Sequence, residues 1–178
     1  KPWKFLASSM VTPILYLVTF GWGLGRGMSM AGGTYLDFMM PGLVALSAMN
    51  NSFGPVSTSV NVSKLYTKTI EEVLVSPVGP WSIALGRALS GTVRGMFSAL
   101  LLLIVGFFSG VRMDLSPFFL LVLGLTAFLF ASAAVAAAMV AKSHEDMSNF
   151  NSFVIIPMSF LAGTFFSPDK LPEPFQSM

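Results

Sequence analysis

The sequence contains no cysteine and little charge. The absence of cysteine among its 178 residues excludes disulfides and thiolate metal sites. Charged residues make up only 10% of the chain, whereas an ordinary soluble domain has about a quarter. Hydrophobic residues make up 54% and the mean hydropathy is +0.75, a composition typical of an integral membrane protein. The formal net charge of +2 does not suggest a nucleic-acid partner.

The long apolar runs also lack carboxylates. All eight acidic residues fall in expected loops or at the ends of apolar runs: Asp37, Glu71, Glu72, Asp114, Glu145, Asp146, Asp169 and Glu173. Carriers driven by protons or sodium usually keep ionisable groups within the membrane, where such groups are costly and serve coupling. The pattern therefore argues against an ion-driven carrier.

No catalytic or metal-binding pattern replaces these carboxylates. The single histidine, His144, has no partners at metal-ligand spacing, and no set of nucleophile, base and orienting group is visible. Gly86 and Gly91 have the glycine spacing of a phosphate loop, but Thr92 follows where lysine is needed. We therefore expect a chain that is not an enzyme and has no cofactor or metal of its own. If it moves a solute uphill, the energy must come from another subunit.

Long apolar runs make up most of the chain. A bilayer core about 30 Å thick needs roughly 20 helical residues, and the ten-residue alternation of membrane strands is absent. We expect one all-α, polytopic transmembrane domain over residues 1–178, with helical spans at about 5–24, 36–62, 81–108, 117–140 and 149–166. The second span contains Pro41 and Pro55 and is longer than needed, so it should tilt, kink or start in the interface. The polar residues 142–148 should form a solvated loop that includes His144.

The distribution of basic residues predicts the orientation. One side of the membrane would hold Lys1, Lys4, Lys64, Lys68, Arg87 and Lys142, and the other Arg26, Arg112 and Lys170. Because cytoplasmic loops collect lysine and arginine, six against three places the N-terminus in the cytoplasm. Five spans then leave the C-terminus outside, which predicts a sixth span beyond Met178. The start at Lys1 likewise suggests part of a longer chain.

The longest polar interruption lies between residues 64 and 81. Thr69 and Glu72 have the spacing of a capping box, in which each side chain accepts a hydrogen bond from the other residue's amide. Pro77 and Pro80 end the helix that starts there after about two turns. We expect a short cytoplasmic helix over about 67–77. By pattern alone it is either a solvated interfacial helix or a surface that a soluble partner grips.

Four polar residues within the expected spans are candidates for a functional role. Arg94 lies seven residues after Arg87 and nearly on the same helix face. Both are functional candidates, or Arg87 snorkels to the headgroups and Arg94 pairs with helix-end carbonyls. Asn50 and Asn51 could line a pathway for a polar headgroup, or could bond a neighbouring helix.

Small residues predict close helix packing at two places. Gly91 and Gly95 are four residues apart, which is the spacing of a small-residue contact between membrane helices. The run 131–141 at the end of the fourth expected span consists mainly of alanine. We expect both segments to pack closely against other spans.

The order of several short motifs resembles the permease subunit of ABC-2 type transporters. These motifs are Tyr35-Leu-Asp-Phe-Met-Met-Pro-Gly-Leu43, Thr69-Ile-Glu-Glu-Val-Leu-Val-Ser-Pro-Val78, Gly86-Arg87, Arg94-Gly95, Phe160-Leu-Ala-Gly-Thr-Phe-Phe-Ser-Pro168 and Leu171-Pro172. They cover nearly the whole chain in the family's order. Two departures are that the amphipathic helix before the first span is missing or shortened, and that the sixth span is absent.

The resemblance implies a six-helix permease that pairs with a second copy and with two cytoplasmic ATPase subunits, which bind ATP and magnesium. It implies that the family's coupling helix, which docks on the ATPase, comprises Lys68, Thr69, Ile70, Glu71, Glu72, Val73, Leu74, Ser76 and Pro77. The family's membrane-dipping outer helices would begin at about 167–178.

The function expected from the resemblance is ATP-driven export of an amphipathic substrate across the cell membrane of a bacterium. The substrate would be a glycolipid, a polysaccharide-lipid or a hydrophobic drug. The alternatives are a channel or secondary carrier, and a membrane scaffold that transports nothing. A scaffold would not need the capped helix after Lys64, and no repeated polar ring suggests a channel filter.

Overall fold

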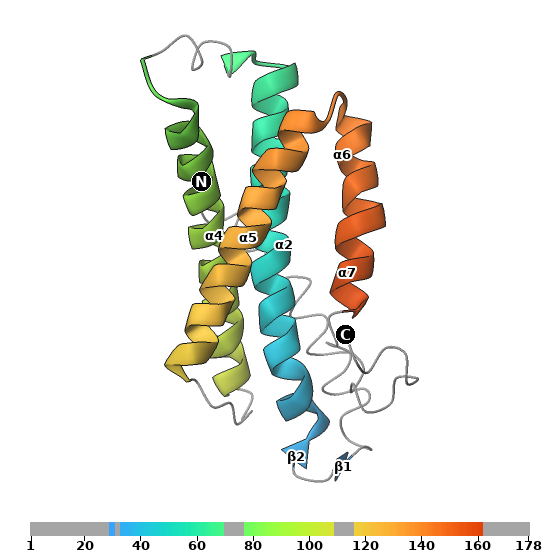
Figure 1. The fold of residues 1–178 in the computed structure, drawn as a ribbon. Coiled ribbons are helices and arrows are strands. Elements are labelled where there is room, and N and C mark those ends of the chain that lie inside the picture. Colours follow the sequence, from blue (N-terminus) through green and yellow to red (C-terminus); the bar gives the residue numbers. More distant parts are fainter. Residues whose placement is uncertain (1–28, 31–32, 70–76, 109–115, 162–178) are drawn as a thin grey trace, which may run out of the picture.

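The computed structural model describes residues 29–30, 33–69, 77–108 and 116–161, and its described part is almost entirely helical (Figure 1). Its elements in chain order are β1 (Ser29–Met30), β2 (Gly33–Thr34), α2 (Tyr35–Leu65), α4 (Pro80–Phe108), α5 (Pro117–Val140), α6 (His144–Phe150), the π-helical segment η2 (Asn151–Ile155) and α7 (Ile156–Leu161). The two strands form a minimal antiparallel pair, in which Ser29 lies opposite Thr34.

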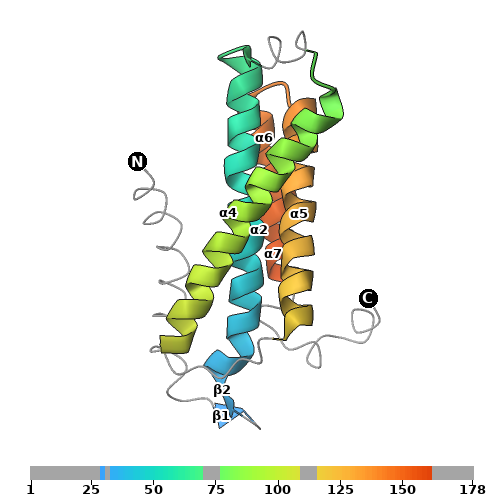
Figure 2. The same ribbon diagram turned by 90° about the vertical axis from the view of Figure 1, so that its left-hand side faces the viewer.

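Helices α2, α4 and α5 form the described core, and each contacts the other two. Helix α4 crosses α2 obliquely, while α6, η2 and α7 follow one another along the far side of α2 (Figures 1 and 2). The ends of α2 and α5 and the starts of α4 and α6 lie at one end of this bundle. We call it the Lys64 end. It is the end at which the expected cytoplasmic helix would lie.

Two of the helices, α4 with 29 residues and α5 with 24, are long and apolar enough to cross a membrane. They coincide with the expected spans 81–108 and 117–140. Helix α2 has 31 residues, about 46 Å at 1.5 Å per residue, but is more polar. Among the described residues, α2 and the helical part of the expected span 149–166 do not meet this criterion, and the expected span 5–24 lies outside the described residues. The total of five spans therefore stays a prediction.

Neither proline divides α2. Pro41 and Pro55 both lie inside the helix, which continues as one element from Tyr35 to Leu65. Pro55 has no amide hydrogen for the carbonyl of Asn51 one turn earlier. Neighbouring helices and hydroxyl side chains can tolerate such a site in a membrane. One such hydroxyl is close by, because Ser57 Oγ donates to the carbonyl of Gly54 at 2.9 Å.

The prediction of a loop at 142–148 is wrong, because helix α6 begins at His144. Ser143 Oγ accepts a hydrogen bond from the Asp146 amide at 3.0 Å, and Asp146 Oδ2 accepts from the Ser143 amide at 3.1 Å. The same carboxylate accepts from the Lys142 amide at 2.9 Å. This capping box provides hydrogen-bond acceptors for backbone amides that have no partner within the first turn of α6. The polar residues therefore form the start of a helix and not a loop.

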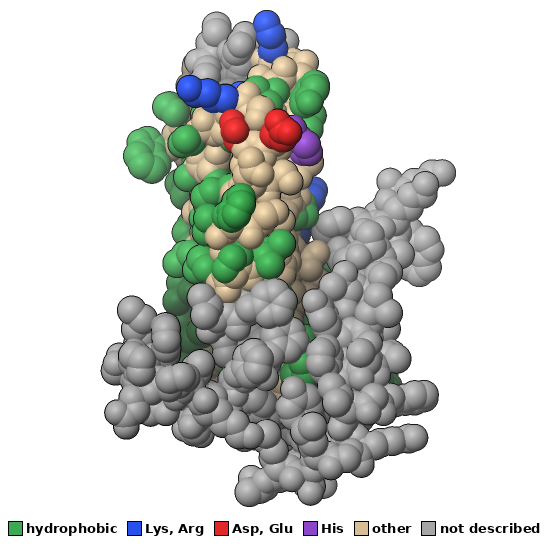
Figure 3. Space-filling model, turned by 90° about the vertical axis from the view of Figure 1, so that its right-hand side faces the viewer, with side chains coloured by type: hydrophobic (Ala, Val, Ile, Leu, Met, Phe, Trp, Pro, Cys, Tyr) green, Lys and Arg blue, Asp and Glu red, His purple; other side chains and the backbone are tan. Residues whose placement is uncertain are grey.

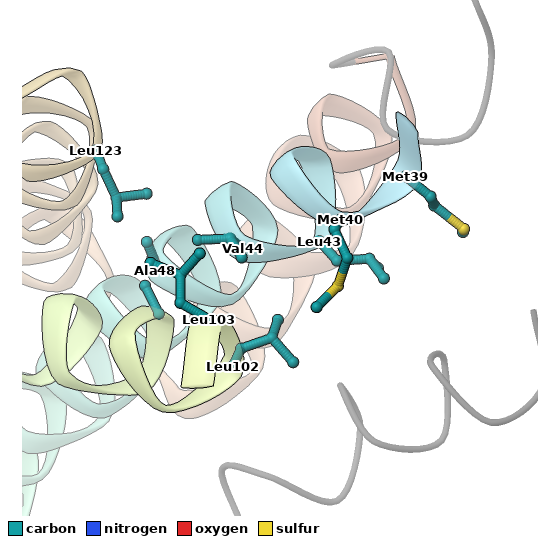
Figure 4. Packing of buried hydrophobic residues seen from close by; sticks show 9 residues of the cluster. Met39, Met40, Leu43, Val44, Ala48, Leu102, Leu103 and Leu123 are labelled. Atoms are coloured by element: carbon teal, nitrogen blue, oxygen red, sulfur yellow. The ribbon is translucent and has the colours of Figure 1, made fainter. Parts of the chain in front are cut away.

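Two apolar clusters join the helices. In the first, α2 contributes Met39, Met40, Leu43, Val44 and Ala48, α4 contributes Ala99, Leu102 and Leu103, and α5 contributes Leu123 (Figure 4). The second lies nearer the Lys64 end, where the rings of Phe53 and Phe150 stack at a centroid distance of 5.8 Å. Lipid tails are as apolar as leucine, so close packing, more than removal from water, must hold these clusters together.

Two glycines set how closely α4 approaches α2. A Cβ atom on Gly91 would lie 2.5 Å from Val56 Cγ2 and 2.8 Å from the Cβ of Ala131 on α5. A Cβ atom on Gly95 would overlap the Ser52 hydroxyl and lie 2.7 Å from the carbonyl oxygen of Ala48. The predicted close packing at these glycines is confirmed. Ala131, Ala134 and Ala138 are fully buried, which confirms the same prediction for α5.

Candidate functional site

The candidate coupling segment begins where α2 ends. Lys68 and Thr69 are exposed, as is Pro77, whereas residues 70–76, and with them Ile70, Glu71, Glu72, Val73, Leu74 and Ser76, lie outside the described residues. Lys68 has a φ of 51°, which is a left-handed conformation. A residue with a side chain adopts it at a cost of about 1–2 kcal/mol. The chain therefore leaves the helical conformation at Lys68, where the segment begins. The proposed capping box of Thr69 with Glu72 also lies outside what the structure describes.

Lys64 fastens the end of α2 to the end of α5. Its Nζ donates to the carbonyl oxygen of Met139 at 2.6 Å and to that of Ala141 at 2.7 Å. The last carbonyls of a helix have no partners within the helix and carry partial negative charge, so an ammonium group is well suited to them. Lys64 and Ala141 are 77 residues apart in the sequence, so this contact joins the two helices at their ends.

A second contact at the same end reaches the start of α6. The side chain of Asn61 is fully buried, and its Nδ2 donates to the carbonyl oxygen of Ser143 at 3.4 Å. Ser143 is the capping residue of α6. Through Lys64 and Asn61, the last turn of α2 thus holds both sides of the joint between α5 and α6.

The third contact connects α2 with α4. Arg87 donates from Nη1 to Ser59 Oγ at 3.1 Å and from Nη2 to Ser63 Oγ at 3.4 Å. The Ser63 hydroxyl itself donates to the carbonyl oxygen of Ser59 at 2.8 Å. Arg87 is half-buried as a residue, and its guanidinium contacts the hydroxyls of α2. Whether its charge also reaches the lipid headgroups stays a prediction.

A groove of about 420 Å³ opens beside this contact. Its described lining comes from α2 and from the first half of α4: Pro55, Val56, Ser59, Ser82, Ile83, Gly86, Arg87, Ser90 and Arg94. Both candidate arginines therefore line one groove, which agrees with their expected place on nearly the same helix face. Among the described lining residues none is acidic, and three serine hydroxyls accompany the two arginines.

Among the described residues, the hydrogen bonds of the two asparagines stay within their own helix. Asn50 Nδ2 donates to the carbonyl oxygen of Leu46 at 3.0 Å, and Asn51 Nδ2 donates to that of Ser47 at 2.9 Å, both within α2. In this part of α2 a polar contact to another helix is made by Ser47, whose hydroxyl lies 3.0 Å from that of Ser98 on α4. Asn50 is exposed and Asn51 half-buried, so a role in a substrate pathway stays a prediction for both.

Sequence reasoning missed Asn61, Lys64 and Ser98 as contact residues. Single serines and asparagines in an apolar run indicate only that a polar partner is needed, not where it lies. One missed feature had a signal, because Ser143 and Asp146 have the capping-box spacing that also led to Thr69 and Glu72.

Charge gathers near the Lys64 end. Figure 3 shows lysine, arginine, acidic and histidine side chains near this end of the bundle and hydrophobic side chains on the described surface below it. Within the described ranges, no group of three or more His, Asp or Glu side chains could hold a metal ion. Among the described residues, this distribution fits a membrane helix bundle whose Lys64 end is in contact with water.

Comparison with known proteins agrees with these observations. The family described as ABC-2 type transporter matches residues 1–178. The inner membrane transport permease YadH of Escherichia coli K12 is 33% identical over 175 residues, which cover 97% of this chain and 68% of that protein. Nodulation protein J of Rhizobium meliloti strain 1021 is 32% identical over 190 residues, covering 98% and 69%. No solved structure matches the chain significantly.

The family match extends over the whole chain, and the identity to YadH extends over nearly all of it. The helices with membrane-spanning length and the charged end are the features expected of a multi-pass inner-membrane protein. The chain belongs to the ABC-2 type transporter family of membrane transport permeases.

Proposed function

We propose that the chain is the permease subunit of an ATP-driven exporter, which moves an amphipathic substrate across the bacterial inner membrane. It works as a dimer with two cytoplasmic ATPase subunits, which bind ATP and magnesium. The substrate classes are a glycolipid or polysaccharide-lipid first and a hydrophobic drug second. Family membership supports this proposal, as does the absence of Asp and Glu from the sequence of α4 and α5, which argues against an ion-driven carrier.

The observation that carries the proposal is the fastening of α2 at the Lys64 end. Three residues before Lys68, where the candidate coupling segment begins, α2 is still a regular helix. Lys64 ties this last turn to the carbonyls of Met139 and Ala141 at 2.6 and 2.7 Å. A force applied to residues 67–77 would then reach the α5–α6 joint through the short turn at residues 66–68 and the Lys64 contact.

The start of α4 belongs to the same unit. Arg87 bonds Ser59 and Ser63 of α2, so the helices on either side of the coupling segment are joined by hydrogen bonds. In the proposed mechanism, ATP binding closes the ATPases, which push on residues 67–77. Helices α2 and α4, around Pro55 and Arg94, move with α5 and α6 and open the seam between the two permease copies.

The test is co-purification of the full-length permease with its ATPase in nanodiscs. The test variant is the double charge reversal Glu71→Arg/Glu72→Arg. The matched control is Glu145→Arg, which reverses an exposed carboxylate at the same end of the bundle but outside residues 67–77. Both variants are first checked for membrane insertion and dimerisation.

We expect the wild type and the control to retain the ATPase and the double variant to lose most of it. Equal retention by all three would refute docking through residues 67–77. If no form binds an ATPase, the exporter proposal itself fails, and a channel, a carrier or a scaffold becomes the better explanation.

A further inference from the structure

We propose that the groove between the end of α5 and the start of α6 binds a phospholipid whose headgroup carries a phosphate and a primary ammonium group. Phosphatidylethanolamine has this chemistry. The proposal does not rest on the export function, because the lipid would be a resident of the membrane and not the transported substrate. It rests on the walls of the groove, on its two charges and on its depth in the membrane.

The groove lies beside the α5–α6 joint and has a volume of about 560 Å³. Figure 1 shows the two helices meeting at this joint and separating away from it. The described lining is apolar except for Lys142 and Asp146, and its α6 side includes Met147 and Phe150. Binding sites for small molecules are typically apolar clefts of this size with a few polar groups.

Small side chains on α5 leave this space open. The groove is lined by Ala133, Ala136, Ala137 and Val140, which have the spacing of one helix face. Ala138 lies on another face and is fully buried within the bundle. The alanine-rich end of α5 therefore packs closely on one face and borders a groove on the other. Longer side chains at the lining positions would fill the groove.

The groove carries one charge of each sign. Lys142 and Asp146 are both exposed, and within the described part of the chain they form no ion pair with each other. Asp146 Oδ2 accepts hydrogen bonds from the backbone amides of Lys142 and Ser143, and the carboxylate has a second oxygen for a ligand. A lysine ammonium donates well to phosphate oxygens, and a carboxylate accepts well from an ammonium group. The pair therefore matches a headgroup that carries both charges.

This charge pattern selects among phospholipid headgroups. An anionic headgroup such as that of phosphatidylglycerol would pair with Lys142 but would offer Asp146 no cation. A choline headgroup is zwitterionic, but its quaternary nitrogen has no N–H group to donate to the carboxylate. Ethanolamine provides an N–H donor for Asp146 beside the phosphate for Lys142, and hydrogen bonds between charged groups are stronger than neutral ones. Phosphatidylethanolamine is therefore the occupant that the groove favours.

The groove lies at the depth where lipid headgroups meet the hydrocarbon. Helix α5 has 24 residues, about 36 Å, and exceeds the roughly 30 Å hydrocarbon core. Its end at Val140 therefore reaches the headgroup region, and Lys142 and Asp146 follow it in the chain. Ala133 lies seven residues before Val140, about 10 Å deeper along the axis. The groove is thus charged at the membrane surface and apolar toward the hydrocarbon, which is the order of polarity in a phospholipid.

The experiment measures binding of dioctanoyl phosphatidylethanolamine to the full-length permease in detergent by native mass spectrometry. The reference lipids are dioctanoyl phosphatidylcholine, which lacks the primary ammonium group, and dioctanoylglycerol, which lacks the whole phosphate headgroup. The same spectra report the fraction of the permease that is dimeric.

One site variant fills the groove and the other removes its positive charge. Ala136 is exposed, so Ala136→Leu lengthens a lining side chain without adding bulk to the core. Its control is Gly86→Leu, because a Cβ atom on Gly86 would meet no atom within 4 Å and this residue lies outside the groove. Lys142→Gln removes the ammonium group. Its control is Lys68→Gln, which changes an exposed lysine at the same end of the bundle that does not line the groove.

We expect the wild type to bind phosphatidylethanolamine more tightly than either reference lipid. Ala136→Leu should weaken binding of phosphatidylethanolamine and of dioctanoylglycerol about tenfold or more, because it fills the apolar part of the site. Lys142→Gln should weaken phosphatidylethanolamine binding about tenfold but leave dioctanoylglycerol binding unchanged, because only the phosphate contact is lost. Both controls should bind the lipids as the wild type does.

Unchanged affinity for phosphatidylethanolamine in both site variants would overturn the proposal. Equal wild-type affinity for phosphatidylethanolamine and phosphatidylcholine would overturn the contact between Asp146 and the ammonium group. A loss of dimer in the Ala136→Leu variant with unchanged lipid binding would show that a second copy of the chain occupies the groove, and the proposal would fail. None of these outcomes depends on export, so this proposal and the proposed function can fail separately.

Discussion

The ammonium group of Lys64 lies 2.7 Å from the carbonyl oxygen of Ala141, although 77 residues separate them in the sequence. It also lies 2.6 Å from the carbonyl oxygen of Met139. One side chain thereby caps the C-terminal end of α5 and holds the last turn of α2 against it. The contact lies four residues before Lys68, so it is the nearest described connection between the candidate coupling segment and the rest of the bundle.

Replacing Lys64 should loosen this end of the bundle. Lys64→Met keeps most of the aliphatic length but removes two charge-assisted bonds, so we expect a loss of about 1.5–3 kcal/mol in unfolding free energy. Denaturant titration in detergent measures this loss. Lys142→Met is the control, because the Lys142 side chain is exposed at the same end. Equal stability of the two variants would contradict a structural role for Lys64.

The glycines of α4 should differ in their tolerance of a methyl group. Gly95→Ala places its Cβ against the Ser52 hydroxyl and the Ala48 carbonyl and should cost about 1–3 kcal/mol of stability. Gly86→Ala meets open space and should be neutral or stabilising by up to about 1 kcal/mol, because alanine favours the helix. The difference between the two unfolding midpoints checks the predicted contact. No difference would mean that α4 does not approach α2 at Gly95.

The buried pair Ser47 and Ser98 should couple α2 to α4 weakly. Their hydroxyls are 3.0 Å apart, and hydrogen bonds between membrane helices contribute about 0.6 kcal/mol on average. A double-mutant cycle with Ser47→Ala, Ser98→Ala and the double variant measures this coupling. The Ser47 hydroxyl also accepts from Asn51 Nδ2 at 3.4 Å, so the single variant at Ser47 should cost more than that at Ser98. A coupling of zero would show that the hydroxyls do not interact.

Removing the cap of α6 should fray its first turn. Ser143→Ala deletes the acceptor of the Asp146 amide and should cost about 1 kcal/mol. Hydrogen exchange of residues 144–150 should accelerate, while exchange in the middle of α5 stays unchanged. Ser148→Ala, an exposed position within α6, provides the control. Unchanged exchange at Asp146 in the Ser143 variant would argue that another group caps the helix.

The sequence predicted the long helices because a bilayer places a simple demand on composition. The expected ranges 81–108 and 117–140 coincide with α4 and α5. The prediction was wrong at His144, where polar residues were taken for a loop. Their side chains instead satisfy the amides at the start of α6, and only the spacing of Ser143 and Asp146 indicated this.

The candidate site was predictable only in part. The seven-residue spacing of Arg87 and Arg94 placed both on one face, and both line one groove. The serines that hold Arg87 were not predictable, because they come from another helix and depend on how α2 and α4 are aligned. The same is true of Asn61 and Lys64, whose partners lie in the joint between α5 and α6.

The sequence by itself determined that this is a membrane protein of the ABC-2 type transporter family, because composition, apolar run length and motif order are properties of the chain alone. Tertiary structure decided which two of three glycines in α4 lie in a helix contact. Gly91 and Gly95 pack against α2 and Gly86 faces an open groove. These residues are chemically identical, so their roles depend on which atoms the crossing of the helices brings near them. The crossing is set by packing between segments far apart in the sequence.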